Sequence, residues 1–521
     1  MTDTLLPITA TMLVKNSARY LPQVLDALHI FDEVLLLDNG STDDTLAIAA
    51  RYPNVSIHHH EFIGFGAMKN LAASLAKHDW IFSIDSDEIL TPELQHSLQA
   101  ADLSRPQYIY TLSRLNHYRG RLIQACGWYP DILPRLYHRA HTQFSNRQVH
   151  EAIERQSDSV LTPLTGDLLH YSFDSADGLI QKMQHYSTLY AEQYRYRKHT
   201  SIPSALLHGI TAFIKHYGFK SGWRYGGDGF TIAVSNAMGS FYKYIKLNER
   251  NQALSVSLII TTYNRPDALG LVLESAVQQT VLPKEIIVAD DGSGEETAAL
   301  IRRFQASSPV PILHSWQEDD GFRAAQSRNR ALAQATGEYI VLIDGDMVLH
   351  PQFIRDHIAS AQLGVWVQGS RVLLTPDSTQ ALLRAPLPQP FRLPFYHASI
   401  EKKHAALRCA GLRKLIGRTL SQSAKAVKSC NMGFFLADAQ AVNGFNNDFV
   451  GWGREDSEFA ARLYHSGLKR RNLKFGGIAY HLWHHEAKRD ALPQNDALLQ
   501  HTLNQKLIRC ENGMNQFTKT V

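Results

Sequence analysis

The chain has 521 residues, which is too long for one hydrophobic core and predicts two or three domains. Its 44% hydrophobic and 20% charged residues are ordinary for a folded protein, and a net charge of +4 does not favour a nucleic-acid partner. Four widely spaced cysteines, an amino terminus without a signal-peptide pattern and the lack of a run of about 18 apolar residues argue against disulfides, secretion and a spanning helix. We therefore expect a reduced, cytoplasmic protein, with membrane attachment left open.

The first half opens with alternating strand and helix patterns. Residues 8–15 (ITATMLVK) predict a buried strand, and residues 18–29 predict a helix. The next apolar strand ends in acid and glycine, in EVLLLDNGSTDDT (33–45), and a further helix–strand unit ends in DWIFSIDSDEIL (79–90). Strand–helix–strand alternation at this spacing predicts a parallel sheet that is covered by helices on both faces.

A helical extension is predicted after this region. Residues 181–246 mix basic and aromatic side chains, as in AFIKHYGFKSGWRYGG (212–227). A polar segment, NERNQAL (248–254), precedes a fresh strand, and we predict the domain boundary there. The expected domains are therefore 1–180, a helical extension with linker at 181–250, and 251–521.

The second half repeats the pattern of the first. Residues 256–263 predict a strand and 266–279 a helix; EIIVADDGSGEET (285–297) and EYIVLIDGDMVL (338–349) again end in acids. The second half also carries an insert at 376–428, which contains a basic helical pattern at 401–422. Ligands of such sheets gather at the carboxyl ends of the strands, where both acidic motifs lie in both halves. The repeat is therefore one of a site as well as of a fold.

The two D-x-D triplets predict sites for a divalent cation. They are Asp85 with Asp87 and Asp344 with Asp346, and no other such triplet occurs in the chain. A nucleotide diphosphate leaving group gains negative charge as the sugar–phosphate bond breaks, and a hard cation held by carboxylates neutralises that charge. The first aspartate of each triplet is expected to reach donor hydroxyls, and the second is expected to hold the metal. One triplet alone is equally typical of a solvated loop.

Further acids and cations near these strands suit a nucleotide. Four acids or amides end the second strand of each copy and suit the uracil N–H and the ribose: Asp38, Asn39, Asp290 and Asp291. A helix N-cap role, with Ser41 or Thr42 opening the helix, is the alternative for this position. Three cations stand where they would meet the diphosphate: Lys69, Arg323 and Arg328. Each of them is equally compatible with a solvated helix face.

At these motifs the chain resembles the family 2 glycosyltransferases of GT-A fold over nearly its whole length. The first half resembles the lipopolysaccharide-core β-1,4-glucosyltransferases, in GFGAMKNLA, DSDE, NHYRGRLIQACGWYPDILPRLYHR, FSNRQVHE and GDLLHYSF. The resemblance implies UDP-glucose as donor, an inner-core heptose as acceptor, Glu151 as general base and His170 as a metal ligand beside Asp87. A buried structural histidine is the alternative for His170. Asn39 departs from the family, in which many members have a second aspartate.

The second half resembles a different subgroup, with a galactosyltransferase-like end in NMGFFLADAQAVNGFNNDFVGWGREDSEFAARL (431–463). The string GWGREDSE matches the G-W-G-x-E-D signature of that subgroup. The match implies an acceptor platform at Trp452, an acceptor contact at Glu455 and a base at Asp456. An acidic helix start is the alternative for this string. In IAYHLWHHE (478–486), His481 is the expected metal ligand, with His484 in reserve.

These observations predict a bifunctional enzyme built from two α/β GT-A domains. It is expected to need Mn²⁺ or Mg²⁺, to use UDP-sugars and to act on a lipopolysaccharide core, a glycolipid or an oligosaccharide acceptor. Peripheral contact with the inner face of the bacterial inner membrane is expected through residues 181–246 or 401–428. A two-site polysaccharide polymerase, and one active transferase with a degenerate acceptor-binding module, remain alternatives. The oligomeric state is left open.

Overall fold

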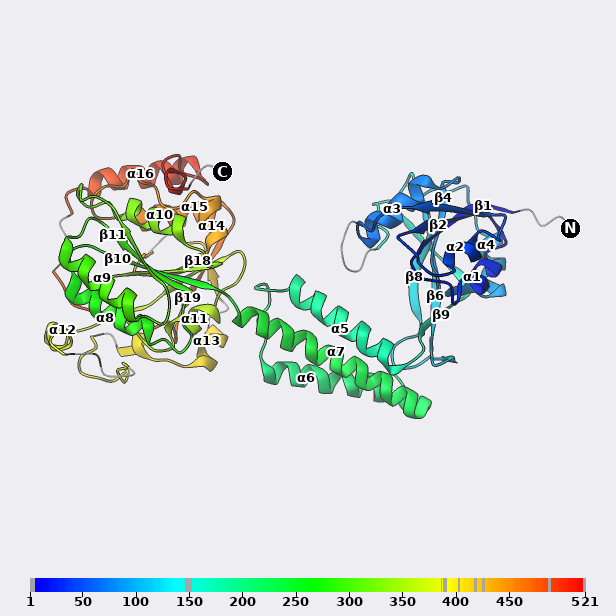
Figure 1. Cartoon of the computed structure of the whole chain (residues 1–521), viewed down its shortest axis with the longest axis horizontal. Coiled ribbons are helices and arrows are strands. Elements are labelled where there is room, and N and C mark those ends of the chain that lie inside the picture. Colours follow the sequence, from blue (N-terminus) through cyan, green and yellow to red (C-terminus); the bar gives the residue numbers. More distant parts are fainter. Residues whose placement is uncertain are drawn as a thin grey trace. The chain divides into compact units, whose positions relative to one another are not determined.

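Two compact units make up the chain, and each contains its own mixed α/β sheet. The computed structural model describes residues 5–145, 152–385, 387, 391–401, 403–416, 419–423, 427–485 and 489–518. The first unit comprises residues 1–193 and 200–246, and the second comprises residues 194–199 and 247–521. Figure 1 shows helices on both faces of the central strands of each unit. The predicted class, α/β in two tandem domains, is confirmed.

The sheet of the first unit has a parallel half and an antiparallel half. Its strands are β1 (Leu6–Val14), β2 (Phe31–Asp38), β3 (Val55–His59), β4 (Trp80–Asp85), β5 (Glu88–Leu90), β6 (Tyr108–Tyr118), β7 (Arg121–Leu122), β8 (Asp131–His138) and β9 (Val160–Phe173). Among the described residues their order is β3-β2-β1-β4-β8-β6-β9-β5, with β7 beside β6. β1 pairs in parallel with β2 and β4, whereas β8 runs antiparallel to β4 and β6. The ends of β2 and β4 therefore share one edge.

Apolar side chains on both faces of this sheet explain why its parallel strands read as continuous hydrophobic runs. The helices of this region are α1 (Leu21–Ala27), α2 (Thr45–Ala49), α3 (Phe65–Leu75) and α4 (Pro92–Gln99). Ile8 and Met12 of β1 lie in a core with residues of α1 and α4. On the opposite face, Leu37 of β2 packs with Met68 and Ala72 of α3. The polar ends of the strands are thereby held on a rigid frame.

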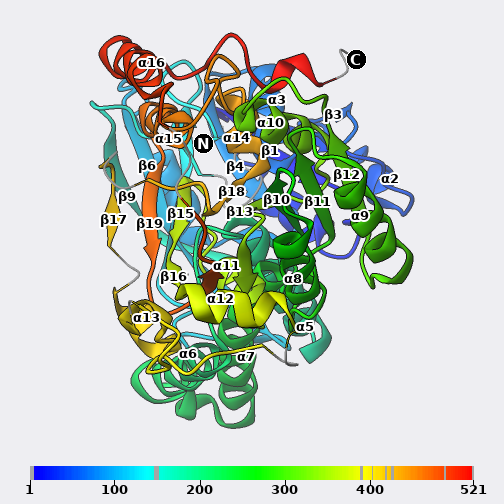
Figure 2. The same ribbon diagram turned by 90° about the vertical axis from the view of Figure 1, so that its left-hand side faces the viewer.

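Three helices, α5 (Ala176–Gln193), α6 (Ile202–Phe213) and α7 (Gly226–Gln252), follow the first sheet, and the sequence predicts a helical extension at 181–250. Tyr244 of α7 stacks on His208 of α6 at 4.3 Å and meets Tyr190 of α5 edge-on at 5.8 Å. Figure 1 shows these helices running side by side, and Figure 2 views them nearly end-on. A π-helical segment (Ile214–Phe219) and a short 3-10 helix (Gly222–Tyr225) connect α6 to α7. Of the helices described, none is both long enough and apolar enough to cross a bilayer.

The second unit has a larger sheet and a smaller one. Its strands are β10 (Val256–Thr262), β11 (Glu285–Asp290), β12 (Ile312–Trp316), β13 (Tyr339–Asp344), β14 (Met347–Leu349), β15 (Val365–Gly369), β16 (Arg371–Leu373), β17 (Leu420–Ser421), β18 (Asn431–Phe435), β19 (Lys469–Leu473) and β20 (Ala479–His481). Within the described ranges the larger sheet has the order β12-β11-β10-β13-β18-β15-β19-β17, and the smaller one the order β14-β20-β16. β14 pairs antiparallel with β20, so that Met347 lies opposite His481. The small sheet thus brings His481 to the D-x-D motif.

Helices cover both faces of the larger sheet. They are α8 (Pro266–Val277), α9 (Glu295–Ser307), α10 (Ala324–Gln334), α11 (Phe353–Ile358), α12 (Pro376–Leu383), α13 (Ala410–Ile416), α14 (Leu436–Ala441), α15 (Glu455–His465) and α16 (Leu492–Gln505), with 3-10 segments at Lys403–Ala406 and Met514–Gln516. Alternate residues of β10 enter different cores: Leu258 and Ile260 pack towards α8, and Ile259 packs towards α10 and α15. α7 ends at Gln252, four residues before β10 begins.

The helical pattern at 401–422 corresponds only in part to helix in the residues that the structure describes there. This stretch contains a 3-10 turn, the seven-residue α13 and the two-residue strand β17. Arg408 donates two hydrogen bonds to the buried Asp356 of α11, and Arg413 of α13 pairs with the same carboxylate. The chain has to bend to bring both guanidinium groups to one carboxylate. Two of the basic residues of the insert are therefore engaged inside the second unit.

Candidate active sites

A cavity of about 900 Å³ lies at the carboxyl edge of the parallel strands of the second unit. This volume is within the range of small-ligand sites, which is roughly 300–1,000 Å³. Its wall brings together nine residues that the sequence had pointed to: Asp291, Arg328, Asp344, Asp346, Trp452, Glu455, Asp456, His481 and His484. The predicted residues Asp290 and Arg323 do not line it.

Asp346 and two histidines form a cluster with the composition of a metal site. His481 Nε2 lies 3.6 Å from Asp346 Oδ2, and His484 Nε2 lies 3.2 Å from the same oxygen. The three ligand atoms lie within 4.8 Å of one another. His484 Nδ1 donates to the carbonyl oxygen of His485 at 2.7 Å, which turns its Nε2 towards Asp346. Asp346 Oδ1 is buried and accepts no hydrogen bond from the described residues, which is expected of a carboxylate oxygen that binds a cation.

Protonation in this cluster follows from burial. Burial raises the pKa of Asp346, but the hydrogen bond with His484 and the nearby His481 outweigh it and hold that pKa below its ordinary value. Burial lowers the pKa of His481, so its imidazole stays neutral, the form that binds metal. The hydrogen bond to Asp346 instead raises the pKa of His484, so this imidazole binds a metal once its second proton is released. A carboxylate with two deprotonated imidazoles then fits a divalent transition ion. The sequence analysis favoured His481 over His484 as the metal ligand. In the structure both lie beside Asp346.

Arg328 of α10 joins the D-x-D motif to the start of α15. Its guanidinium lies 3.5 Å from Asp344 Oδ1 and 2.9 Å from Glu455 Oε1. The Arg328 side chain is only 5% exposed, which rules out the alternative of a solvated helix face. Burial raises the pKa of Asp344, and the positive charge of Arg328 opposes that rise. Arg328 therefore connects the expected donor side of the cavity with the expected acceptor side.

Asp456 has the properties of a general base. It lies in the first turn of α15, where its Oδ1 accepts from the Ser457 amide at 2.6 Å and its Oδ2 from the Ser429 amide at 3.3 Å. Burial and the neighbouring charge of Glu455 raise the pKa of Asp456 to about 7, against the opposing charge of Arg328. A carboxylate with a pKa near the working pH suits proton abstraction.

A turn with positive φ presents Trp452 to the cavity. Gly451 has φ +77° and Gly453 has φ +108°, conformations that favour glycine, and Gly451 donates its amide to the Phe322 carbonyl at 2.8 Å. The indole is 40% exposed, and the Arg489 guanidinium lies 5.2 Å from its ring centroid. A solvent-facing indole beside two carboxylates is suited to stack on a sugar.

Of the two acids of the second unit that are expected to contact the nucleotide, Asp290 is buried and Asp291 lines the cavity. Asp290 is fully buried, where it accepts from the Ser293 amide at 2.8 Å and contacts His314 Nε2 at 2.7 Å. Asp291 accepts from Gln317 and from the Arg323 amide, and burial raises its pKa to about 6. The Arg323 side chain turns to Asp320 instead. α9 begins at Glu295, so neither acid is its N-cap.

Five cationic residues of the cavity wall were not predicted from the sequence: Arg265, Arg371, Lys428, Arg454 and Arg489. Arg265 comes three residues after the end of β10, and its place at the carboxyl edge of a parallel strand was the signal that would have found it. Arg371 begins β16 in the small sheet, and nothing in its local sequence points to that position. Both add positive charge where a diphosphate is expected.

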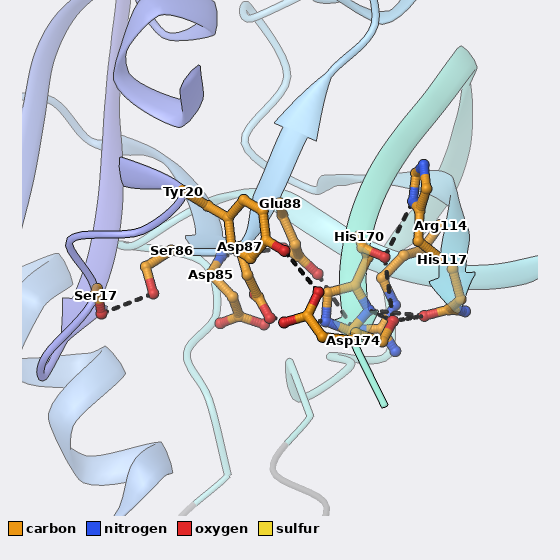
Figure 3. Close-up of polar contacts among 12 residues, drawn as sticks. Ser17, Tyr20, Asp85, Ser86, Asp87, Glu88, Arg114, His117, His170 and Asp174 are labelled. Atoms are coloured by element: carbon orange, nitrogen blue, oxygen red, sulfur yellow. Dashed lines mark hydrogen bonds and ion pairs between the residues drawn. The ribbon is translucent and has the colours of Figure 1, made fainter. Parts of the chain in front are cut away.

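The D-x-D motif of the first unit lies at the equivalent edge, after β4 (Figure 3). Asp85 lies 3.2 Å from Arg135 Nη2 and 3.9 Å from Lys69 Nζ. Arg135 also contacts the buried Glu88 at 2.6 Å. Burial raises the pKa of Asp85, but Arg135 and Lys69 hold it well below its ordinary value. Arg135 and Glu88 were missed, since Arg135 comes from the antiparallel strand β8, 50 residues further along the chain.

Asp87 faces His170 in the first unit, as the sequence had suggested. His170 Nε2 lies 3.3 Å from Asp87 Oδ2, and β9 brings it there by pairing antiparallel with β5. His170 Nδ1 lies 2.7 Å from Asn116 Oδ1, and the Ser172 hydroxyl donates to the same oxygen. A proton on Nδ1 leaves the Nε2 lone pair aimed at a carboxylate, which suits a cation between the two. Asn116 is a positioning residue that was not predicted.

Asp38 is the last residue of β2, and Asn39 follows it. Asp38 is buried and accepts from the amides of Gly40 and Ser41 at 3.1 and 3.0 Å, so it shapes the loop; α2 begins only at Thr45, and Asp38 is not its N-cap. Asn39 Oδ1 is buried and accepts no hydrogen bond from the described residues, which leaves it available to a ligand N–H. Glu151, the expected base, lies outside the described residues.

The comparison with protein families matches both halves of the chain. A family model described as glycosyl transferase family 2 matches residues 9–154 and 257–414, and a model described as the N-terminal domain of galactosyltransferase matches residues 420–485. The two family 2 matches begin at β1 and β10, one in each unit. The predicted tandem GT-A fold and the galactosyltransferase-like region of the second half are thereby confirmed.

Several curated proteins are similar over about half of the chain. Hyaluronan synthase of Pasteurella multocida is 29% identical over 251 residues, which are 46% of this chain and 26% of that protein. An uncharacterised glycosyltransferase of Rickettsia prowazekii (strain Madrid E) is 29% identical over 269 residues, 49% of this chain and 91% of that protein. Chondroitin synthase of Escherichia coli is 28% identical over 261 residues, 43% of this chain and 34% of that protein. The chain thus covers about a quarter of the hyaluronan synthase.

Similar solved structures include S. aureus TarS 1-349 in complex with UDP-GlcNAc, with 14% identity, a TM-score of 0.37, and coverage of 51% of this chain and 69% of that one. The mannosyltransferase PcManGT of Pyrobaculum calidifontis, in complex with GDP-Man and Mn²⁺, has 18% identity and a TM-score of 0.31 over 59% of this chain and 77% of that one.

Proposed function

This chain belongs to glycosyl transferase family 2, and we propose that it carries two active sites, each of which transfers a sugar from a UDP-sugar donor to a glycan acceptor. The observation that carries the proposal is the repeated site. In both units a strand ends in a D-x-D motif whose second aspartate faces a histidine, at 3.3 Å in the first and 3.6 Å in the second. A degenerate acceptor-binding module would have no need to keep this pair.

In the second unit the acceptor hydroxyl is deprotonated by Asp456 as it attacks the anomeric carbon of the donor. The bond from that carbon to the diphosphate oxygen breaks on the opposite side, so the configuration inverts and the nucleoside diphosphate leaves with the electron pair. Trp452 and Glu455 hold the acceptor sugar beside the base. Arg328, Arg265 and Arg371 supply positive charge for the phosphates. Glu151 is the proposed base of the first unit.

Residues of both units are suited to hold a divalent cation: Asp87 with His170, and Asp346 with His481 and His484. When bound, such an ion neutralises the charge that develops on the diphosphate. Mg²⁺ prefers oxygen ligands, whereas imidazole nitrogen favours transition ions. We therefore propose Mn²⁺ rather than Mg²⁺ for the second unit, because two of its three candidate ligands are imidazoles.

We propose a lipopolysaccharide-type core as the acceptor and UDP-glucose as the donor of the first unit. The support is the run of motifs through which the first half resembles core β-1,4-glucosyltransferases, from GFGAMKNLA to GDLLHYSF. The donor of the second unit is a UDP-hexose that its galactosyltransferase-like region does not identify further. On this proposal the chain makes two separate additions to one acceptor.

A two-site polysaccharide polymerase is the second candidate function. Two of the similar proteins are named for polymers, hyaluronan and chondroitin. A polymerase would alternate its two sites and release long chains from the same donors. The two candidates therefore differ in product length rather than in the chemistry of either site.

The proposed acceptor is anchored in a membrane, and α6 offers a surface for contact with the inner face of that membrane. Five large apolar side chains are at least half exposed on and just after this helix: Ile202 (63%), Leu206 (54%), Leu207 (62%), Ile210 (50%) and Ile214 (50%). The small residues Ala205 and Gly209 are the buried ones, and Gly209 lies against Phe241 of α7. Amphipathic helices in proteins normally bury their large apolar residues, so this face is suited to a lipid surface.

Product analysis by mass spectrometry tests the proposed function. The purified protein is incubated with Mn²⁺, a core oligosaccharide acceptor and a panel of UDP-sugars. The wild type is expected to add two sugars and no more. Asp456→Asn is expected to stop after the first addition. Glu151→Gln is expected to add nothing to the bare acceptor but to extend an acceptor that already carries the first sugar.

A series of products of increasing length would contradict the proposed core transferase and support the polysaccharide polymerase. Loss of both transfers in either folded single variant, with the second transfer measured on an acceptor that already carries the first sugar, would contradict the two-site arrangement. Failure of every donor and acceptor combination in the folded protein would overturn the proposed function itself.

A further inference from the structure

A second cavity, of about 580 Å³, lies in the first unit between the strands β6, β8 and β9 and the helices α5 and α7. Residues of α5 line it at helical spacing, among them Lys182, Met183 and Tyr186, and α7 contributes a polar stripe that includes Asn236 and Lys243. The two helices also contact each other, through Tyr190 with Tyr244 and Lys246 with Ser187, and the cavity lies beside these contacts. We call this space the extension cavity.

The extension cavity begins next to the candidate metal site of the first unit. Asn116 lines the cavity, and its side chain also holds His170, which faces Asp87 at 3.3 Å. Arg114, a second wall residue, contacts Glu88 at 3.2 Å. Glu88 in turn accepts a hydrogen bond from the Asp85 amide at 3.0 Å. Figure 3 shows Arg114 beside His170. A molecule in this cavity therefore lies one residue away from the D-x-D motif.

The chemistry of the wall suits an anionic saccharide. Aromatic rings from three elements line the cavity, which suits stacking on sugar faces: Trp128, Phe173, Tyr186 and Tyr190. Three basic side chains line it as well, Arg114, Lys182 and Lys243, against one carboxylate, Asp131. Asp131 is paired with Arg114 at 2.7 Å. Two lysines therefore give the cavity a net positive charge.

Lys182 is the cation that is best placed to meet a ligand. Its side chain is exposed, and its ammonium lies 4.8 Å from the centre of the Phe173 ring. Tyr186, one turn further along α5, is 43% exposed. A charged ammonium next to an accessible aromatic ring is a combination that binds a sugar and its anionic substituent together.

We propose that the extension cavity is the acceptor subsite of the first unit and that it selects an oligosaccharide carrying a phosphate or carboxylate group. This inference rests on the proposed function of the first unit as a transferase. It adds that the helical extension is part of the acceptor site, and that Lys182 and Lys243 are specificity-determining residues. The sugar rings lie against the aromatic residues, and the anionic group lies at the two lysines.

Direct binding to the full-length protein tests the proposal without requiring turnover. Calorimetry compares three forms of one core oligosaccharide: phosphorylated, enzymatically dephosphorylated, and carrying only a carboxylate sugar. Lys182→Gln and Lys243→Gln are each expected to weaken binding of the anionic forms about tenfold or more. Binding of the neutral form is expected to stay within about twofold. Lys182→Arg is expected to restore most of the affinity, and Lys215→Gln, a cation of the same extension that does not line the cavity, serves as the matched control.

Kinetics separates this proposal from the proposed function. The lysine variants are expected to raise the acceptor KM of the first transfer about tenfold and to leave the donor KM unchanged. Transfer that proceeds with an unchanged acceptor KM in both variants would overturn the cavity proposal and leave the function intact. Anionic binding that depends on Lys182, without transfer from any donor, would support the cavity and overturn the function. Equal affinity for the neutral and anionic forms would also overturn the proposal.

Discussion

Asp85 and Asp344 hold equivalent positions but meet different charges. Asp85 lies between Arg135 and Lys69, which keep its pKa well below the ordinary range. Asp344 has Arg328 on one side and the second aspartate, Asp346, on the other, and its pKa is raised by burial. The first unit therefore neutralises its motif largely with its own cations. The second unit places one arginine, Arg328, beside its motif, so we expect its transfer to depend more on a divalent ion.

The raised pKa of Asp456 predicts a pH dependence for the second transfer. A base works only when it is ionised, so kcat/KM is expected to rise with pH through about 7 and to fall about tenfold per unit below that value. Glu455→Gln removes the neighbouring negative charge that raises this pKa, so the variant is expected to shift the profile to lower pH. The measurement uses an acceptor that already carries the first sugar, with metal saturating at each pH. A flat profile between pH 5.5 and 8, with chemistry rate-limiting, would remove Asp456 from the role of base.

Metal titrations are expected to separate the three histidines of the second unit. His481→Ala and His484→Ala each remove an imidazole beside Asp346, and each is expected to raise the Mn²⁺ concentration for half-maximal second transfer about 10–100-fold. His485→Ala is the matched control, because only its backbone carbonyl contacts His484. The first transfer is expected to keep its metal requirement in all three variants. An unchanged titration in folded His481→Ala and His484→Ala would show that the ion binds elsewhere.

At the level of elements, the parallel half of each sheet could be predicted and the antiparallel half could not. The strand expected at 8–15 is β1 at Leu6–Val14, and the strand expected at 256–263 is β10 at Val256–Thr262. These strands are buried on both faces, so their sequences are apolar throughout. β8 carries mixed side chains, β20 has only three residues, and the partners of both are distant in sequence. Arg135 on β8 and the approach of both His481 and His484 to Asp346 therefore depend on tertiary pairing that local patterns do not contain.

Asp356 ties three elements of the second unit together, and its removal is expected to be costly. Its carboxylate is 1% exposed and binds Arg408, Arg413 of α13 and the amide of Gly477 just before β20. Asp356→Ala leaves two guanidinium groups without their buried partner, which typically costs about 3–5 kcal/mol. For a unit of this size that corresponds to a fall in Tm of roughly 6–20 °C.

Differential scanning calorimetry measures this loss, and Asp377→Ala on the exposed start of α12 is the control. The control is expected to change stability by less than about 1 kcal/mol. Since β20 carries His481, Asp356→Ala is also expected to weaken the second transfer more than the first. A Tm within about 2 °C of the wild type would show that the insert is anchored by other contacts.

At the scale of the whole molecule, both units have a D-x-D motif with a facing histidine at the carboxyl edge of the sheet. The chain also has a helix, α6, with exposed apolar side chains. Residues 200–227 around α6 contain three basic residues and no acidic one. Basic residues beside an apolar face suit an anionic lipid surface, where each cation near the surface contributes about 1 kcal/mol. In the insert, by contrast, Arg408 and Arg413 are engaged by Asp356. We therefore expect α6 rather than the insert to make the membrane contact.

Flotation with liposomes tests this expectation. The protein is expected to float with vesicles that contain anionic lipid at low salt, to bind less at high salt, and to bind weakly to neutral vesicles. Leu206→Gln with Ile210→Gln changes two side chains that are at least half exposed, so the fold is expected to persist while binding falls at least tenfold. Lys403→Gln in the insert is the matched control and is expected to float like the wild type. If the double variant floats unchanged, a surface other than α6 makes the membrane contact. If the wild type stays in solution at low salt, the expected membrane contact is wrong.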